Sequence, residues 1–187
     1  MISIRRALPA DAPAIAAVHV SAWRSTYAGL LPDPYLAALS EARLAAFYRR
    51  GLVERRHGEA LFVAVARDRP DGLGQVVGFA SGGRARRGGS AGAWAEGEIA
   101  TLYLLDDWRD QGIGRRLLRA AAAHLAAIGC ESAMLWVLTG NPARWFYQHL
   151  GGRRVAVELT RVGGQNVEQS AMLWDPIALL LEATIRA

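Results

Sequence analysis

EIATLYLLDDWRDQGIGRRLLR, Glu98 to Arg119, is the stretch that decides the fold of this chain. It begins as an apolar strand, passes through a polar turn with two glycines, and continues into a helix with a leucine-rich face. The glycines, Gly112 and Gly114, let the backbone bend and approach a ligand with no side chain in between. The N–H groups of such a turn converge beside a helix N-terminus, which predicts a phosphate-binding site.

Two familiar phosphate-binding turns do not fit this stretch. No Gly-Lys-Ser/Thr follows, so it is not a P-loop. The dinucleotide fingerprint needs a third Gly or Ala where this chain has Arg115 and Arg116. The pattern is Arg109-x-x-Gly112-x-Gly114, in which the arginines add positive charge. A tight strand-to-helix turn that needs only small residues would carry the same glycines. The sequence around the turn must therefore decide between a phosphate site and a purely structural turn.

Length and composition indicate one ordinary domain over residues 1–187. Hydrophobic residues make up 52% of the chain and charged residues 21%, which excludes a disordered chain. No apolar run approaches the ~20 residues of a membrane span, and no secretory h-region stands at the N-terminus. We therefore expect a cytoplasmic protein with no membrane partner. The single cysteine, Cys130, excludes an internal disulfide and makes a zinc site a poor interpretation, so we expect no metal.

The formal charge of +5 leaves two interpretations open. A basic surface can bind nucleic acid. Alternatively, an arginine-rich, lysine-free and alanine-rich composition is common in GC-rich genomes. The chain has no lysine and no recognised nucleic-acid motif. We favour the compositional interpretation and expect no nucleic-acid partner.

Short strands and helices alternate along the chain, with no internal repeat. We expect strands at 2–6, 60–66, 75–81, 98–105, 132–138, 153–160 and 167–174, and helices at about 11–23, 36–52, 113–128, 141–150 and 176–185. Residues 82–97, rich in Gly, Arg and Ala, are expected to be a mobile surface connection. The helix at 113–128 lies between two strands that we expect to be parallel. The fold class is therefore α/β (α+β), a mixed, mostly antiparallel sheet of about six to seven strands flanked by helices.

Three stretches together resemble the GCN5-related N-acetyltransferase (GNAT) superfamily. They are the Arg-x-x-Gly-x-Gly turn after a Glu-Ile-x-x-Leu-Tyr strand, the later Asn141…Ala143…Phe146-Tyr147…Gly151, and Trp23-x-x-x-Tyr27-x-Gly29-x-Leu31-Pro32, which looks like the first-helix region of many small bacterial members. The order of elements agrees across nearly the whole chain. The resemblance implies a GNAT fold whose parallel strands splay apart at the cofactor site.

The resemblance also implies acetyl-CoA as the co-substrate. The backbone of Leu102, Tyr103 and Leu104 would bind the pantetheine arm as a further strand does. An N–H group near Leu102 would stabilise the oxyanion. The remaining cofactor contacts are expected from the turn and from the start of the helix at 141–150: Arg109, Gln111, Gly112, Ile113, Gly114, Arg115, Asn141 and Ala143.

Two residues match the catalytic positions that the resemblance implies. Tyr147 would stand near the sulfur of CoA, where a phenol can protonate the departing thiolate. Its alternative is a helix aromatic that packs on the core. Glu98 would act as a general base through water, or else is a solvated carboxylate or a substrate anchor. The four histidines show neither metal spacing nor a triad pattern.

The acceptor is expected to be a primary amine of a small molecule or peptide, attacking the thioester directly in a ternary complex. Trp23 and Tyr27, the 30–36 loop and the last hairpin would form its pocket. The alternative is a catalytically silent, acyl-CoA-binding regulatory protein. The apolar tail at 176–187 is able to mediate a homodimer. The family ends the tyrosine helix with Gly and an aromatic residue, whereas this chain has Gly151-Gly152, which leaves the packing beneath Tyr147 open.

Overall fold

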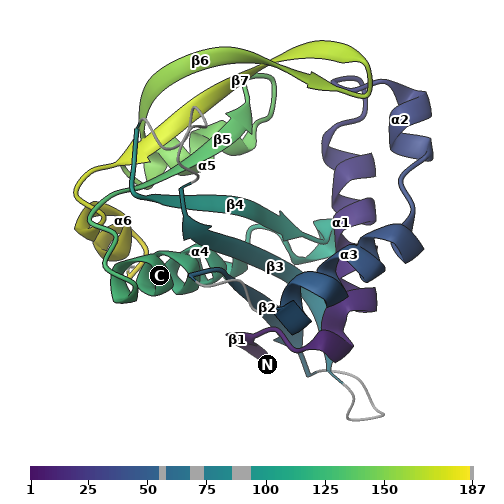
Figure 1. The fold of residues 1–187 in the computed structure, drawn as a ribbon, viewed down its shortest axis with the longest axis horizontal. Helices are drawn as coiled ribbons and strands as arrows, with labels where there is room; N and C mark the ends of the chain where they lie inside the picture. Colours follow the sequence, from purple (N-terminus) through teal and green to yellow (C-terminus); the bar gives the residue numbers. More distant parts are fainter. Residues whose placement is uncertain (55–57, 68–73, 86–93, 186–187) are drawn as a thin grey trace.

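A seven-stranded sheet carries the fold, with its strands in the order β1-β2-β3-β4-β5-β7-β6 (Figure 1). The computed structural model describes residues 1–54, 58–67, 74–85 and 94–185. The strands are β1 (Ile2–Arg6), β2 (Ala60–Ala66), β3 (Gln75–Arg84), β4 (Gly97–Leu104), β5 (Ala133–Leu138), β6 (Arg153–Val162) and β7 (Gln165–Trp174). Neighbours pair antiparallel except β4 and β5, which are parallel. The expected mixed sheet is confirmed.

Helices cover both faces of this sheet. They are α1 (Ala12–Thr26), α2 (Asp33–Ala37), α3 (Glu41–Glu54), α4 (Ile113–Ala127), α5 (Ala143–His149) and α6 (Ala178–Ala183), with 3-10 turns η1 (Pro9–Asp11) and η3 (Asp106–Trp108). The core between α4 and the sheet also holds residues of α5 and α6, whereas α1 and α3 pack on the opposite face. β4 contributes to both cores, because Leu102 and Leu104 face α4 while Tyr103 faces α1.

The region expected to form one helix at 36–52 is two helices, so that prediction was wrong. α2 ends at Ala37 and α3 begins at Glu41. Ser40 starts the second helix, since its Oγ accepts a hydrogen bond from the N–H of Arg43 at 3.3 Å. Arg24 satisfies the end of the first helix by donating to the carbonyls of Leu36, Ala37 and Leu39. The break is thus stabilised at both ends.

The surface connection expected at 82–97 is shorter than the sequence suggested. β3 continues to Arg84, and β4 begins at Gly97. Gly82 and Gly83 lie inside β3, where added Cβ atoms would approach the neighbouring backbone to 3.0 Å and 3.1 Å. Close strand packing therefore explains these glycines better than a loop does. The expected mobility concerns mainly 86–93, which lie outside the described residues.

Candidate active site

The two parallel strands separate soon after they meet. β4 pairs with β5 only at Gly97–Ala133 and Glu98–Met134. On its other side β4 stays paired with β3, but Ala100 is left out of the register between Ile99 and Thr101. A bulge bends its strand, and the pairing of β4 with β5 has ended just before this one. The result is a gap between two central strands.

Backbone groups of β4 line the gap. The N–H of Leu105 bonds to the carbonyl of Val77 on β3 at 2.9 Å. In an antiparallel pair, alternate residues direct both backbone groups to the partner. Tyr103 therefore faces β3, whereas the N–H and C=O groups of Leu102 and Leu104 point toward β5. They receive no ladder partner there, because the β4–β5 pairing has already ended at Glu98.

The turn at the end of the gap depends on its two glycines for different reasons. Gly112 is the residue before α4 and has φ of +73°, a conformation that glycine adopts without strain. A Cβ added at Gly112 would meet nothing within 4 Å, so the space in front of the helix is open. A Cβ at Gly114 would lie 3.2 Å from Cδ1 of Leu104, so this glycine lets α4 pack on β4. The N–H groups of the first helical turn have no intrahelical acceptor and face the open side.

The polar side chains of the turn connect it to α1. Nη2 of Arg109 lies 2.7 Å from Oδ1 of Asp106 and donates to Oγ1 of Thr26 at 2.8 Å. Ser25 Oγ donates to the same Asp106 oxygen at 3.0 Å. Gln111 Nε2 donates to the carbonyl of Asp107 at 2.9 Å. Arg109 and Gln111 thus brace the turn through contacts within the protein.

Asn141 joins the two sides of the gap. It is buried just beyond the end of β5. Its Oδ1 accepts from the N–H of Ala143 at 2.9 Å, which caps the start of α5. Its Nδ2 donates to the hydroxyl of Tyr27 at 3.5 Å. The side chain expected to contact a cofactor therefore positions α5 and Tyr27.

Tyr147 lies on α5 against the core, with 7% of its surface exposed. Burial, and secondarily the neighbouring Tyr27, raise the pKa of its phenol above the ordinary value of 10.0. The hydroxyl therefore stays protonated at neutral pH. Trp174 packs edge-on to the Tyr147 ring, with 6.4 Å between centroids. A Cβ at Gly152 would lie 2.7 Å from the Trp174 ring, which explains why a glycine stands where the family has an aromatic residue.

A model of the Acetyltransferase (GNAT) family matches residues 20–151, more than half of the chain. The chain belongs to the GNAT acetyltransferase family. The Uncharacterized N-acetyltransferase YuaI of Bacillus subtilis (strain 168) is 33% identical over 180 residues, which are 96% of each protein. The expected family and the expected enzyme class, an acetyltransferase, are confirmed.

Solved GNAT structures share the architecture. The PaiA N-acetyltransferase of Thermoplasma acidophilum, in complex with coenzyme A, aligns with a TM-score of 0.63 and 19% identity over 91% of this chain and 98% of that one. The yncA protein of Salmonella typhimurium, with its cofactor acetyl-CoA, aligns with a TM-score of 0.65 and 18% identity over 94% of each. At these identities the likeness shows the fold alone. It confirms the GNAT fold.

In this GNAT chain an aromatic cluster covers the α1 side of the gap. Trp23 packs against Tyr27 at 4.9 Å and against Tyr103 at 6.3 Å, measured between ring centroids. Trp23 Nε1 is buried, and among the described residues it has no hydrogen-bond partner of good geometry. Behind these rings, His19 Nδ1 lies 2.8 Å from the Tyr48 hydroxyl, and burial lowers the His19 pKa from 6.5 to about 4. His19 is thus a neutral packing residue.

Glu98 lies in the paired first part of β4, before the part of the strand that has lost its β5 partner. Glu98 stands where β4 and β5 still pair, four residues before Leu102. A strand rises about 3.3 Å per residue, so the carboxylate is roughly 10 Å or more from that N–H group. Any exchange of protons between Glu98 and the gap therefore requires water.

Sequence reasoning missed several residues that build the site. Asp106 and Ser25 were overlooked because their contact joins residues 81 apart in the chain. The capping function of Asn141 was readable, since Asn favours helix N-termini. Trp174 carried no signal beyond strand periodicity.

The part of the chain that the structure describes contains no group of three or more His, Cys, Asp or Glu able to hold a metal ion.

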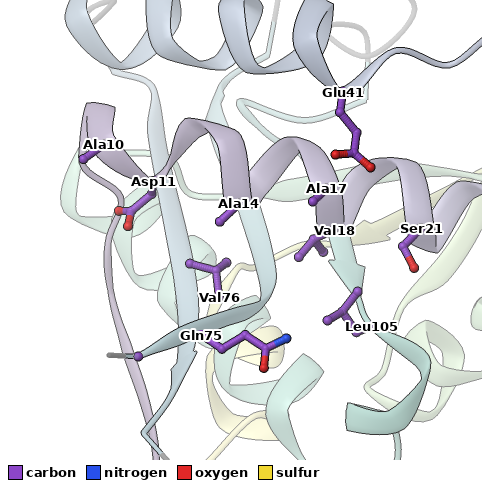
Figure 2. Close-up of a pocket in the computed structure, with 11 residues that line it drawn as sticks. Ala10, Asp11, Ala14, Ala17, Val18, Ser21, Glu41, Gln75, Val76 and Leu105 are labelled. Carbon is purple, nitrogen blue, oxygen red and sulfur yellow. The ribbon is translucent and has the colours of Figure 1, made fainter. Parts of the chain in front are cut away.

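A separate pocket of about 580 Å³ lies between α1, the start of β3 and Glu41 of α3 (Figure 2). Ala10, Ala14 and Ala17 form much of its wall. Glu41 and Asp11 are the two carboxylates that line the pocket, and Asp11 forms an ion pair with Arg5 at 2.7 Å. None of the predicted site residues lines this pocket.

No described helix is long and apolar enough to cross a membrane.

Proposed function

We propose that this GNAT protein transfers an acetyl group from acetyl-CoA to a primary amine by direct attack in a ternary complex. The observation that carries the proposal is the gap between β4 and β5, which ends at the open, glycine-capped start of α4. A pantetheine arm carries two peptide-like amides, and a pyrophosphate is an anion. The gap and the helix start suit these two parts in the order in which CoA carries them.

Donor binding is assigned to backbone groups first. Leu102 and Leu104 would pair with the amides of pantetheine, since their backbone groups point toward β5. The N–H groups from Gly112 to Arg115 would hold the pyrophosphate, together with the helix dipole. The structures of PaiA with coenzyme A and yncA with acetyl-CoA support this choice of donor. Arg109, Gln111 and Asn141 would act mainly by fixing the shape of the site.

The chemistry is assigned to three groups. The Leu102 N–H would polarise the thioester carbonyl and stabilise the oxyanion. Tyr147 would protonate the departing thiolate, and its raised pKa keeps it in the proton-donating form. Glu98 would accept, through water, the proton that an ammonium loses before it attacks. An ordinary alkylammonium has a pKa of about 10 and is mostly charged at neutral pH, so it must lose this proton before it attacks.

The acceptor would enter from the α1 side. Trp23 and Tyr27 line that side, and the β6–β7 hairpin reaches across to α2 (Figure 1). A Cβ at Gly163 on the hairpin tip would lie 2.7 Å from Tyr35 of α2, so the two segments are in direct contact. This contact closes one flank of the acceptor side. It favours a small molecule or a chain terminus over a broad protein surface.

The test is an amine panel incubated with acetyl-CoA, read by mass detection of products and by release of free thiol. The expected result is an acetylated product and one thiol for each acetyl group transferred. A panel that includes small amines, amino acids and short peptides covers the proposed class. Binding of acetyl-CoA with no thiol release across the whole panel would contradict the proposal and indicate a silent acyl-CoA-binding protein.

A further inference from the structure

A pair of hydroxyl groups joins β3 and β4 beside the gap. Oγ of Ser81 and Oγ1 of Thr101 lie 2.7 Å apart, and the two residues are direct partners in the ladder. Both side chains are only partly buried. In the part of the chain that the structure describes, neither hydroxyl makes another hydrogen bond. One proton is shared between the two oxygens, so the pair keeps a second O–H group and spare lone pairs for a ligand.

The hydroxyl pair lies on the α1 face of the sheet. Side chains alternate along a strand, and Leu102 and Leu104 of β4 pack in the core beneath α4. Thr101 therefore projects to the opposite face, as Tyr103 does in the core beneath α1. Ser81 shares this face, because residues directly opposite in an antiparallel pair project to the same side. This is the side from which the acceptor is proposed to enter.

Thr101 stands next to the group assigned to the oxyanion. It directly precedes Leu102, whose N–H points toward β5 and would polarise the thioester carbonyl. Consecutive Cα atoms are about 3.8 Å apart, so a hydroxyl carried on Cβ of Thr101 stays close to that N–H. Tyr103, the other neighbour of Leu102, carries its hydroxyl at the far end of a ring that packs against His19 and Trp23. Of these two neighbours, Thr101 presents the polar atom nearer to the reacting carbonyl.

The bulge in β4 brings Glu98 to the same face as Thr101. Before the bulge, Ile99 belongs to the core beneath α4, and a Cβ at Gly97 would lie 2.9 Å from Cδ1 of Leu125 on α4. Glu98, between these two residues, therefore points to the α1 face. In a regular strand, residues three apart project to opposite faces, but the extra residue of the bulge restores Glu98 and Thr101 to one face.

We propose that the Thr101 hydroxyl binds the attacking amine and that Ser81 is a positioning residue for this hydroxyl, an inference that rests on the proposed function. The amine donates an N–H to Oγ1 of Thr101, which directs its lone pair at the acetyl carbon in the gap. Ser81 restricts the rotation of the Thr101 hydroxyl through the 2.7 Å contact. A hydroxyl oxygen accepts from an ammonium and from a neutral amine alike. The acceptor therefore stays in place while Glu98, on the same face, takes its proton through water.

The experiment compares Thr101→Val, Thr101→Ser, Ser81→Ala and the double variant Ser81→Ala/Thr101→Val, using the best acceptor from the amine panel. Valine keeps the branched shape of threonine without the hydroxyl, whereas serine keeps the hydroxyl. Thr184→Val is the matched control, because it makes the same change at the end of α6, where the hydroxyl donates to the carbonyl of Leu180.

Three measurements separate acceptor binding from a purely structural function, since a cross-strand hydroxyl pair also stabilises a sheet. Thermal melting verifies that each variant is folded. Calorimetric titration gives the Kd for acetyl-CoA. Steady-state kinetics give kcat and KM for the acceptor.

Thr101→Val should lower kcat/KM for the acceptor by about 10- to 100-fold, while the Kd for acetyl-CoA stays as in the wild type. Thr101→Ser should retain most of the activity, and Ser81→Ala should lose less than Thr101→Val. The double variant should be no slower than Thr101→Val alone, because Ser81 acts through Thr101. Thr184→Val should keep wild-type kinetics.

An unchanged kcat/KM in Thr101→Val, an equal loss in Thr101→Ser, or losses that multiply in the double variant would overturn the inference. A weaker Kd for acetyl-CoA in Thr101→Val would also overturn it, because the residue would then act on the donor. Product formation by the wild-type enzyme tests the proposed function separately. No product with any amine would refute that function and this inference with it, whereas product formation with normal Thr101→Val kinetics would refute the inference alone.

Discussion

Replacing Gly112 with Asp or Asn tests where the anion of the donor binds. Both side chains tolerate the left-handed conformation better than other residues, and both should cost about 1–2 kcal/mol of stability at φ of +73°. The space around Gly112 is open to 4 Å, so neither residue clashes with the protein. The two variants therefore differ mainly in one negative charge. Any difference in donor affinity between them reports the charge of the ligand at this position.

The expected size of the difference follows from Coulomb's law. Two unit charges about 4 Å apart repel by ~1 kcal/mol in bulk water and ~4 kcal/mol at an effective dielectric constant of about 20. Gly112 is exposed, so the cost lies between these limits. Since about 1.4 kcal/mol is tenfold in Kd, Gly112→Asp should bind acetyl-CoA roughly 5-fold to 1,000-fold more weakly than Gly112→Asn.

Thermal melting with acetyl-CoA gives a direct reading. At a ligand concentration of about 100 Kd, binding adds ~2.7 kcal/mol, or roughly 5–10 °C in Tm for a domain of this size. A 100-fold weaker Kd would reduce that gain to about 0.4 kcal/mol. Calorimetric titration should rank the variants in the same order. Equal stabilisation of Gly112→Asp and Gly112→Asn by acetyl-CoA would refute an anion site at this turn.

Three further predictions concern catalysis, pH and folding. Tyr147→Phe should lower kcat by about 10²- to 10⁴-fold with little change in KM for acetyl-CoA, as measured by thiol release; an unchanged kcat would leave Tyr147 as a packing residue. His19 has a pKa of about 4 in the folded protein against 6.5 in the unfolded chain. The neutral imidazole therefore contributes fully to the free energy of unfolding above pH 6.5, and this contribution is lost as the pH falls through 4. Urea unfolding should therefore show that His19→Gln loses less stability between pH 7 and pH 4 than the wild type does. The difference should be at most about 3 kcal/mol after allowing for the partial exposure of His19. Parallel curves of stability against pH for the two proteins would contradict the lowered pKa of His19. Ser40→Ala should remove the cap of α3 and lower the unfolding free energy by about 1 kcal/mol, a fall of roughly 2–4 °C in Tm, and an unchanged Tm would mean that the 3.3 Å contact contributes nothing.

Local patterns predicted the elements of this fold well where one residue type decides the geometry. The helix expected at 113–128 is α4, which ends at Ala127, and Gly129 follows it with φ of +82°. Alternating and apolar runs located β2 at Ala60–Ala66 without error. The break at Ser40 was missed because apolar spacing was followed across it, although Ser is a readable N-cap.

The sequence offered candidate residues for the site, but not the contacts that position them. Motif positions pointed to Gly112, Asn141 and Tyr147 as candidates, whereas the direction of the Asn141 and Tyr147 side chains depends on contacts distant in sequence. Arg109, for example, donates a hydrogen bond to Thr26, 83 residues away in the chain, which its motif position does not reveal. The bulge at Ala100 depends on the pairing of β4 with β3 on one side and with β5 on the other, and no local sequence pattern encodes this pairing. Tertiary pairing therefore decides what the motif alone leaves open.

Amide hydrogen exchange of the isotope-labelled protein, measured by NMR with and without saturating acetyl-CoA, tests most directly whether the donor lies between β4 and β5. If the donor binds there, exchange should slow at Leu102 and Leu104, whose N–H groups point toward β5, and across 112–115 at the start of α4. Amides of the edge strand β6 should not change. Unchanged exchange at Leu102 and Leu104, with new protection instead around Ala14 and Val76 in the separate pocket, would contradict it.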